Sequence, residues 1–455
     1  MKNMRQIAVD QLVKYLTSDP VKKISKIVSL VQKLDRKHKY SDVMDIIADA
    51  LMGESDVWKK FTEDLFREVD TKTLQKLAEC FLVNVAFVGG PKRDKIKEKY
   101  NCNVPLALLI DPTSACNLNC TGCWAAQYGK QHNLSYDILD SLCQQGRELG
   151  VYWFLFSGGE PLIRKTDIIR LCEKYQDCYF FAFTNGTLVD EQLCEDIRRV
   201  GNFTLAFSIE GNEANTDMRR GKGCYKRVVE AMDLMKKHKL FFGYSTCYTH
   251  YNTESVASDE FVDEMIARGC RFAWNFTYIP IGKDAQLDLI ATPEQRAYMY
   301  KRVQEIRTTK PLIALDFWND GETAHGCIAG GRSYLHINAA GDVEPCAFIH
   351  YANVNIHNVS LLEALQAPLF QEYKKHQPFN SNPLIPCPLL DNPEILIEMV
   401  NNSNAYSTQL DGPEPVEELC SKTVLAAQRW APVAEKLWEE RQQIKKEKEA
   451  KAAKR

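Results

Sequence analysis

Three cysteines stand close together after an apolar run in the first third of the chain. Cys116, Cys120 and Cys123 have the spacing C-x3-C-x2-C, and they follow residues 106–110, whose apolar character predicts a buried strand. Three thiolates on one short loop can hold three irons of a cubane [4Fe–4S] cluster, which leaves the fourth iron for a ligand from outside the protein. Zinc is the alternative, but structural zinc usually takes four protein ligands in paired knuckles, and no second knuckle lies nearby in the sequence.

Four further segments with polar or glycine residues follow later predicted strands. They are Ser157-Gly158-Gly159-Glu160-Pro161, Thr184-Asn185, Ser208-Ile209-Glu210 and Asp217-Met218-Arg219-Arg220-Gly221. Glycines allow a ligand to approach the backbone closely, and a guanidinium group can bind a carboxylate through two hydrogen bonds. Each segment alone is also compatible with an ordinary turn or a surface loop. Their regular placement at successive strand ends is what favours a site.

Taken together, the cysteine spacing and these segments resemble the signature of the radical S-adenosylmethionine (SAM) enzymes. In that family the open iron binds the amino and carboxylate groups of SAM, and reductive cleavage of SAM gives a 5′-deoxyadenosyl radical. The resemblance implies that the three cysteines hold the catalytic cluster. It also implies SAM contacts at Gly158, Gly159, Glu160 and Pro161 for the amino group, at Thr184 and Asn185 beside SAM, at Ser208 and Glu210 for the ribose and methionyl parts, and at Arg220 for the carboxylate.

The chain departs from the family pattern just before the third cysteine. Many members carry an aromatic residue there that packs near the adenine, whereas this chain has Gly122, followed after the cysteine by Trp124. Trp124 either replaces that aromatic residue or belongs to the core. The segment Tyr278-Ile279-Pro280-Ile281-Gly282 resembles the part of relatives that lies near the adenine. Cys247, which follows the fifth predicted strand, is either a pocket residue or one of many small buried cysteines.

A second group of cysteines lies in the last third of the chain. Cys327 is followed by thirteen residues, Gly341, four residues and Cys346, and the intervening segment predicts a hairpin with a turn at Gly341. This pattern resembles the opening of the SPASM and twitch domains, which hold auxiliary iron–sulfur clusters, and Cys387 is a third candidate ligand. The run C-x2-C-x5-C-x3-C of a complete SPASM domain is missing, so one auxiliary [4Fe–4S] cluster is expected. The fourth ligand stays open among Cys420, His325, His350, Asp391 and substrate, and structural zinc or unligated thiols remain the alternative.

Apolar runs alternate with helical periodicity from about residue 104, which predicts βα units and a parallel sheet. Six units are too few for a closed eight-stranded barrel, and they fit the partial (β/α)6 TIM-like barrel of the radical SAM family, with sites at the carboxyl ends of the strands. We expect an N-terminal helical region (1–103), a radical SAM core (104–310), a SPASM/twitch-like auxiliary-cluster domain (311–412), and a C-terminal helix with a charged tail (413–455). The six predicted strands are 106–110, 152–156, 179–183, 204–208, 241–245 and 271–276.

The N-terminal region carries a strong positive charge on predicted amphipathic helices. Residues 1–40 contain ten Lys and Arg against three Asp, a local excess of +7. Such helices are compatible with an anionic membrane surface, and equally with a helical cap on the barrel that turns its lysines to solvent. The net charge of the whole chain is −3, which gives no reason to expect nucleic-acid binding. The 16 cysteines, without a secretory signal or a long apolar segment, predict a cytoplasmic protein, with peripheral membrane contact as an option.

These observations predict a radical SAM enzyme that abstracts hydrogen from an unactivated C–H bond. The basic N-terminus favours a lipid or membrane-associated substrate. The alternatives are maturation of a peptide or a cofactor by the same chemistry, and a non-catalytic iron–sulfur or zinc protein with a regulatory role. An electron donor such as flavodoxin or ferredoxin is the expected partner.

Overall fold

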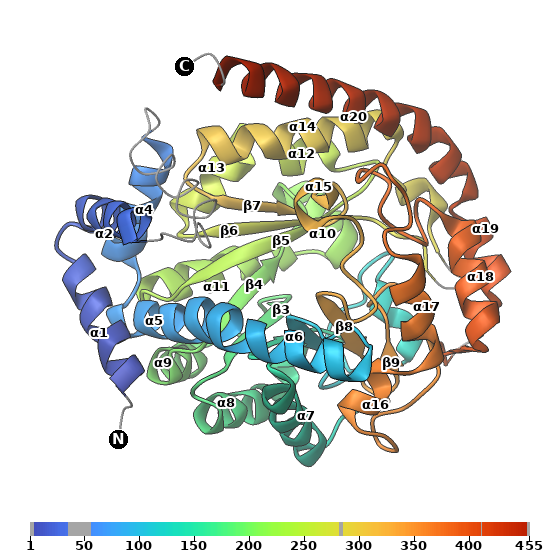
Figure 1. The fold of residues 1–455 in the computed structure, drawn as a ribbon, viewed down its shortest axis with the longest axis horizontal. Coiled ribbons are helices and arrows are strands. Elements are labelled where there is room, and N and C mark those ends of the chain that lie inside the picture. The colour runs from blue at the N-terminus through green and yellow to red at the C-terminus, as the bar shows by residue number, and fades with distance from the viewer. Residues whose placement is uncertain (1–3, 35–55, 282–284, 411, 453–455) are drawn as a thin grey trace.

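The computed structural model describes residues 4–34, 56–281, 285–410 and 412–452. Its centre is a nine-stranded sheet with the order β7-β6-β5-β4-β3-β2-β1-β8-β9, curved into a partial barrel (Figure 1). The first six strands are β1 (Ala107–Ile110), β2 (Trp153–Phe156), β3 (Tyr179–Thr184), β4 (Phe203–Ser208), β5 (Phe242–Tyr248) and β6 (Phe272–Thr277). All six pair in parallel with their sequence neighbours, so the predicted α/β class and its six strands are confirmed, with ends shifted by up to three residues.

Two more parallel strands extend the sheet beyond the predicted six. β7 (Ile313–Asp316) pairs with β6. On the other side, β8 (Tyr334–Ile337) pairs in parallel with β1, and β9 (Val343–Glu344) returns antiparallel to β8. The predicted hairpin around Gly341 is therefore present, and its first strand is also a strand of the barrel.

Helices between the strands cover the outside of the sheet, and most begin where a cap residue stands in the sequence. Ser135, Asp190 and Ser258 each accept a backbone N–H of the first turn, and Thr292 forms a capping box with Gln295. The elements of this part are η2 (Trp124–Tyr128), α7 (Tyr136–Leu149), η3 (Pro161–Arg164), α8 (Lys165–Lys174), α9 (Glu191–Val200), α10 (Glu213–Arg220), α11 (Cys224–Lys237), α12 (Thr253–Ala257), α13 (Asp259–Ala267), η4 (Leu287–Leu289) and α14 (Pro293–Thr309).

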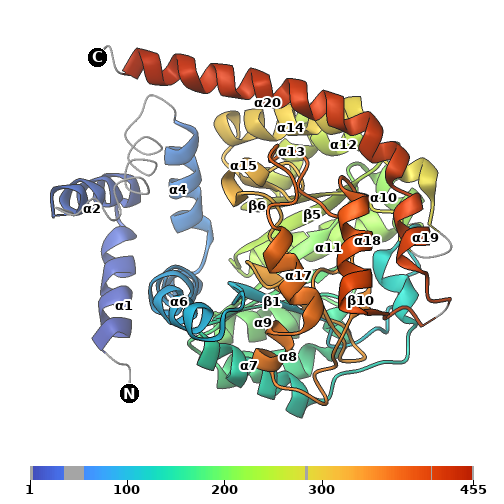
Figure 2. The same cartoon turned by 45° about the vertical axis from the view of Figure 1, so that its right-hand side comes forward.

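The N-terminal helices pack partly against the amino ends of the strands. They are α1 (Met4–Leu16), α2 (Pro20–Leu34), α4 (Val57–Glu68), α5 (Thr71–Lys76), the wide π-helix η1 (Leu77–Val88) and α6 (Gly89–Tyr100). Phe81 of η1 stacks edge-on against Trp153 with ring centres 4.9 Å apart, and the Asp70 N–H donates to the Lys239 carbonyl. These contacts support the cap interpretation for α5 and η1, whereas α1 and α2 stand at the side of the barrel (Figure 2).

The C-terminal part contains several helices. Two of them, α17 (Pro368–His376) and α18 (Pro393–Ser403), lie in the predicted auxiliary-cluster domain. Both begin at a proline, which is favoured in the first turn of a helix. The other elements are α15 (Gly321–Ala324), α16 (Leu361–Leu365), β10 (Tyr351–Ala352), β11 (Tyr406–Ser407), α19 (Val416–Ser421) and α20 (Val424–Ala452), which crosses over α14 (Figure 2). Among the described residues, no helix combines the length and apolar character needed to cross a membrane.

Candidate active site

A cavity of about 340 Å³ lies inside the barrel and opens toward the carboxyl ends of the strands. Cys116, Cys120 and Cys123 all line it, on the loop that follows β1. The loop is held by hydrogen bonds from the Leu118 N–H to Cys116 Sγ at 3.4 Å and from the Thr121 N–H to the Arg219 carbonyl at 2.9 Å. Burial raises the pKa of the Cys116 and Cys123 thiols.

The two glycines after β2 bring that segment directly against the cysteine loop. The Gly159 N–H donates to the Thr113 carbonyl and the Glu160 N–H to the Ala115 carbonyl, at 3.0 and 2.8 Å. A β-carbon on Gly159 would stand 2.0 Å from the Ala115 oxygen, and Gly158 has a φ of +97°. The glycines therefore permit close packing of two backbone segments as well as access for a ligand.

Glu160 is bound by the next strand end. Its carboxylate accepts hydrogen bonds from the Thr184 hydroxyl at 2.7 Å, the Asn185 N–H at 2.8 Å and the Leu162 N–H at 3.0 Å. The side chain is 1% exposed, and burial raises its pKa. Asn185 also donates from its amide to Asn117 of the cysteine loop at 2.9 Å. These residues, which sequence resemblance placed beside SAM, thus connect three loops of the site.

A buried cluster with an excess of positive charge also lines the cavity. Arg219 Nη1 and Arg220 Nη2 lie 2.6 and 2.5 Å from the same oxygen, Oε1 of Glu210, and the second oxygen accepts the Cys247 N–H at 3.0 Å. Burial alone would raise the pKa of Glu210, but the two arginines outweigh it and lower that pKa. The Arg219 Nε is buried without a hydrogen-bond partner. Sequence reasoning singled out Arg220 alone and missed Arg219, although the adjacent pair of arginines was visible.

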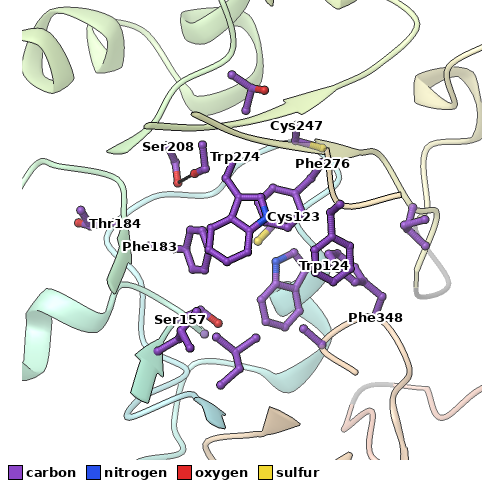
Figure 3. Close-up of a pocket in the computed structure, with 18 of the residues that line it drawn as sticks. Cys123, Trp124, Ser157, Phe183, Thr184, Ser208, Cys247, Trp274, Phe276 and Phe348 are labelled. Carbon is purple, nitrogen blue, oxygen red and sulfur yellow. Dashed lines mark hydrogen bonds between the residues drawn. The ribbon is translucent and has the colours of Figure 1, made fainter. Parts of the chain in front are cut away.

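The sulfur of Cys247 belongs to the same cavity. Cys247 and Ser208 both line it (Figure 3). Ser245 lines it as well, and its hydroxyl oxygen lies 3.3 Å from that of Ser208. Burial raises the pKa of the Cys247 thiol to about 11, so the thiol is protonated at neutral pH.

The position of Gly122 explains its departure from the family pattern. Its φ is +64°, and a β-carbon there would lie 2.7 Å from the ring of Tyr278. No larger side chain fits, because Tyr278, from the segment that resembles the adenine region, already occupies that place and lines the cavity. Gly282, at the end of that segment, lies outside the described residues. Trp124 also lines the cavity and contacts Phe348 with ring centres 5.8 Å apart.

The deeper part of the cavity is a cage of aromatic and aliphatic side chains. Figure 3 shows the ring of Trp274 in the middle of this wall, with Phe183 beside it, and their ring centres are 5.3 Å apart. Among the residues that line the described cavity, the Asp, Glu, Lys and Arg side chains are Glu160, Arg219 and Arg220, and all three lie near the cysteine loop. Sequence reasoning read these strands as buried and did not assign them to a site, although the spacing of Trp274 and Phe276 placed both on one face of β6. Other large apolar members include Trp153, Leu155, Leu315, Phe317, Tyr334 and Phe348.

The second group of cysteines gathers around Tyr373 of α17. Cys327, Cys346, Cys387 and Cys420 all raise the pKa of this buried tyrosine, after burial itself. Burial is also the main reason that the pKa of Cys387 rises to about 11 and that of Cys327 and Cys420 to about 12.

Nearby hydrogen bonds reach two of these sulfurs. The Tyr334 hydroxyl lies 2.7 Å from Cys346 Sγ, and the Leu390 N–H donates to Cys387 Sγ at 3.3 Å. Within the described residues, no three His, Cys, Asp or Glu side chains converge on a site for a single metal ion.

The alternative fourth ligands named from the sequence differ in their surroundings. The Asp391 carboxylate pairs with Arg296, whose Nη1 and Nη2 lie 2.5 and 3.3 Å from its two oxygens. His350 Nε2 lies 3.1 Å from the Ala347 carbonyl, and burial lowers its pKa to about 4. His325 is exposed, and Cys420 is fully buried.

Comparison with known proteins identifies the family. The profile described as "Radical SAM superfamily" matches residues 110–264, from the last residue of β1 into α13. This part of the chain, about a third of its length, is a radical SAM domain. The domain is that of a radical SAM enzyme, and the cofactors of this family are a [4Fe–4S] cluster and SAM.

Relatives of this radical SAM protein include enzymes that mature cofactors and peptides. An AdoMet-dependent heme synthase from Methanosarcina barkeri is 24% identical over 284 residues, covering 56% of this chain and 80% of the relative. A PqqA peptide cyclase from Granulibacter bethesdensis is 25% identical, covering 59% of this chain and 76% of the relative. The structure of SuiB from Streptococcus suis, bound to its precursor peptide SuiA, shares the fold at a TM-score of 0.53 and 16% identity, covering 65% of this chain and 72% of SuiB.

These relatives support the alternative substrate expectation better than the main one. They are peptide or cofactor maturases, and so they favour the alternative interpretation over a lipid substrate. Membrane contact of the N-terminal helices and the identity of the electron donor stay predictions.

Proposed function

We propose that Cys116, Cys120 and Cys123 hold the catalytic [4Fe–4S] cluster, with SAM bound between the cysteine loop and the ends of β2 to β5. The observation that supports this proposal most directly is that the three sulfurs share one cavity with the Ser157–Glu160 segment, Ser208 and the arginine pair. When bound, the cluster supplies an electron that cleaves SAM to methionine and the 5′-deoxyadenosyl radical. The donor set fits this group, because three thiolates leave one iron for SAM.

Arg219 and Arg220 would together receive the carboxylate of SAM. Glu210 carries one negative charge against two guanidinium charges, so this buried cluster has a net charge of +1. A buried excess charge is costly unless an anion compensates it, and the unpartnered Nε of Arg219 adds a free donor. Glu160 acts indirectly, by fixing the Thr184–Asn185 turn against the cysteine loop.

The aromatic cage would hold the part of the substrate that loses hydrogen. Its walls exclude water and offer no charged group besides those near the cysteine loop, so the reacting group is uncharged and apolar. A peptide side chain of that kind, or an apolar part of a cofactor precursor, suits both the cage and the chemistry named for the relatives. We therefore place the protein among the peptide or cofactor maturases of the superfamily.

A lipid chain is the second candidate, favoured by two observations. The cage is uncharged and aromatic, and α1 exposes Ile7, Leu12 and Tyr15, with exposed fractions of 43–49%, close to the lysines of α2. Flotation of the full-length protein with anionic vesicles separates the candidates. Flotation that disappears on adding salt favours the lipid candidate, and no flotation removes it.

The auxiliary site would consist of Cys327, Cys346, Cys387 and Cys420. Asp391 is neutralised by Arg296, His350 already contacts a backbone carbonyl, and His325 is exposed. Cys420 is therefore the best available fourth ligand. Tyr334 beside Cys346 would tune the potential of a cluster there.

The decisive test of the proposed activity is an assay for 5′-deoxyadenosine. The anaerobically reconstituted protein, given SAM and dithionite, should release it, and a variant with all three of Cys116, Cys120 and Cys123 changed to alanine should not. A wild-type protein that binds iron and sulfide yet cleaves no SAM would contradict the proposal and favour a non-catalytic role.

A further inference from the structure

A fully buried network of three charged side chains joins the start of the cysteine loop to the hairpin that leads to Cys346. His336 of β8 lies between two carboxylates: its Nε2 is 3.0 Å from Asp111 Oδ2 and its Nδ1 is 2.6 Å from Glu344 Oε2. All three side chains are at most 1% exposed. Asp111 directly follows β1, and Glu344 of β9 stands two residues before Cys346.

Further hydrogen-bond donors fix the two carboxylates of this network. Asp111 accepts a hydrogen bond from the Ser157 hydroxyl at 3.0 Å. Glu344 accepts the Tyr128 hydroxyl at 2.7 Å and the Asn338 amide at 3.1 Å, as well as the Thr408 hydroxyl. With His336 included, the four donors to Glu344 come from three separate segments of the chain, so its carboxylate position is strongly determined.

His336 carries a positive charge in this setting. Burial alone would lower the pKa of the imidazole, but Asp111 and Glu344 outweigh burial and raise it to about 10. Removing the cation would leave two buried carboxylates facing each other without compensation, which is unfavourable. The imidazolium therefore holds the two segments together as well as filling space.

We infer that His336 is a positioning residue that fixes the SAM-cluster loop relative to the auxiliary-cluster hairpin. The inference rests on the proposed function only in naming the two loops as cluster loops. The imidazolium and its two carboxylates set the distance between the two segments. Trp124 packs against His336, with ring centres 5.5 Å apart. The substrate cage lies between the same two segments, because Cys123 and Phe348 both line it.

Hydrogen–deuterium exchange of the cluster-loaded protein tests this role. In His336→Gln we expect exchange in residues 112–123 and 338–348 to rise together, by about tenfold or more, because the ion pair with Asp111 and the charge-assisted hydrogen bond to Glu344 are both lost. The electron paramagnetic resonance spectrum of the reduced cluster at Cys116–Cys123, recorded with SAM, should change in parallel.

The matched control is His350→Gln. His350 is equally buried and also packs near Trp124, at 6.3 Å between ring centres, but it contacts a backbone carbonyl instead of two carboxylates. Exchange in residues 112–123 should stay unchanged in this variant. An unchanged cysteine loop in His336→Gln, or an equal response in His350→Gln, would overturn the inference.

Tyr128→Phe keeps the test usable if His336→Gln does not fold. It removes a single hydrogen bond to Glu344 and should give the same paired rise at lower amplitude, and no rise would count against the inference. Failure of the proposed function would give a different result, namely a wild-type protein that takes up no iron–sulfur cluster. The exchange rates of wild type and variants can then still be compared on the proteins as purified.

Discussion

Gly159 lies so close to Ala115 that a β-carbon on Gly159 would stand 2.0 Å from the Ala115 carbonyl oxygen. Since Ala115 immediately precedes Cys116, the Ser157–Pro161 turn and the cysteine loop form one packed unit. The glycine pair is therefore required by the protein itself, before any ligand binds.

Gly159→Ala should displace the cysteine loop. We expect it to destabilise the protein by about 1–3 kcal/mol and to lower the iron retained at the catalytic cluster, because the clash is with backbone and cannot be relieved by a side-chain rotation. Thermal unfolding and iron content measure the two effects. Gly90→Ala in α6 is the matched control, since its β-carbon would meet only Arg93 at 3.9 Å, and it should lower neither quantity. Equal behaviour of the two variants would contradict the packing argument.

Arg219→Lys and Arg220→Lys should each weaken SAM binding. Lysine keeps the charge but loses the planar donor pair, so we expect affinity to fall by about 10- to 100-fold in the cluster-loaded protein, as measured by calorimetry. Arg198→Lys, on the exposed surface of α9, is the control and should bind SAM normally. If Arg219→Lys bound SAM as well as the wild type, the carboxylate site would belong to Arg220 alone.

Cys420→Ala should remove the auxiliary cluster and leave the catalytic one. Total iron and sulfide should fall by roughly half, while SAM cleavage to 5′-deoxyadenosine continues. Cys270→Ala serves as the control, because Cys270 is also fully buried but lies among core residues near Tyr244. Full iron content in Cys420→Ala would show that another residue completes the auxiliary site.

The buried carboxylate of Asp316 predicts a pH dependence of stability. Burial, and then Asp320, raise the pKa of Asp316 to about 6 in the folded protein. The native state therefore binds more protons than the unfolded state between about pH 4 and 6, so this residue makes the protein less stable as pH rises through that window, by roughly 3 kcal/mol in total.

Asp316→Asn should remove that dependence. The difference between the unfolding free energies of wild type and variant, measured from pH 4 to 7, should change across the window and level off above it. A constant difference for Asp316→Asn would mean that Asp316 titrates normally.

Local pattern predicted the strands well and long-range pairing poorly. The runs that became β1 to β6 are continuous and apolar, so their type and approximate ends followed from the sequence alone. The hairpin at Gly341 was also visible, but nothing local indicated that its strand β8 would pair with β1, more than 220 residues earlier. That pairing depends on the curvature of the whole sheet.

The sequence predicted which residues form the site better than it predicted the contacts between them. The motif segments do meet in one cavity, as their placement after successive strands implied. The sequence did not show that the hydroxyl of Thr184 is already bound to Glu160, or that Arg219 shares Glu210 with Arg220. Nor did it assign Trp274 to a substrate wall, because a buried aromatic residue on a strand looks the same whether it faces the core or a cavity.

The pairing of β8 with β1 has a consequence for any attempt to shorten this protein. A fragment that stops after β7 would lose β8 and leave the backbone N–H and C=O groups along one side of β1 without partners. That bare edge lies directly before the cysteine loop, so such a fragment would tend to associate through it. The C-terminal third of the chain therefore supplies a strand that the barrel needs, and a minimal catalytic fragment has to include it.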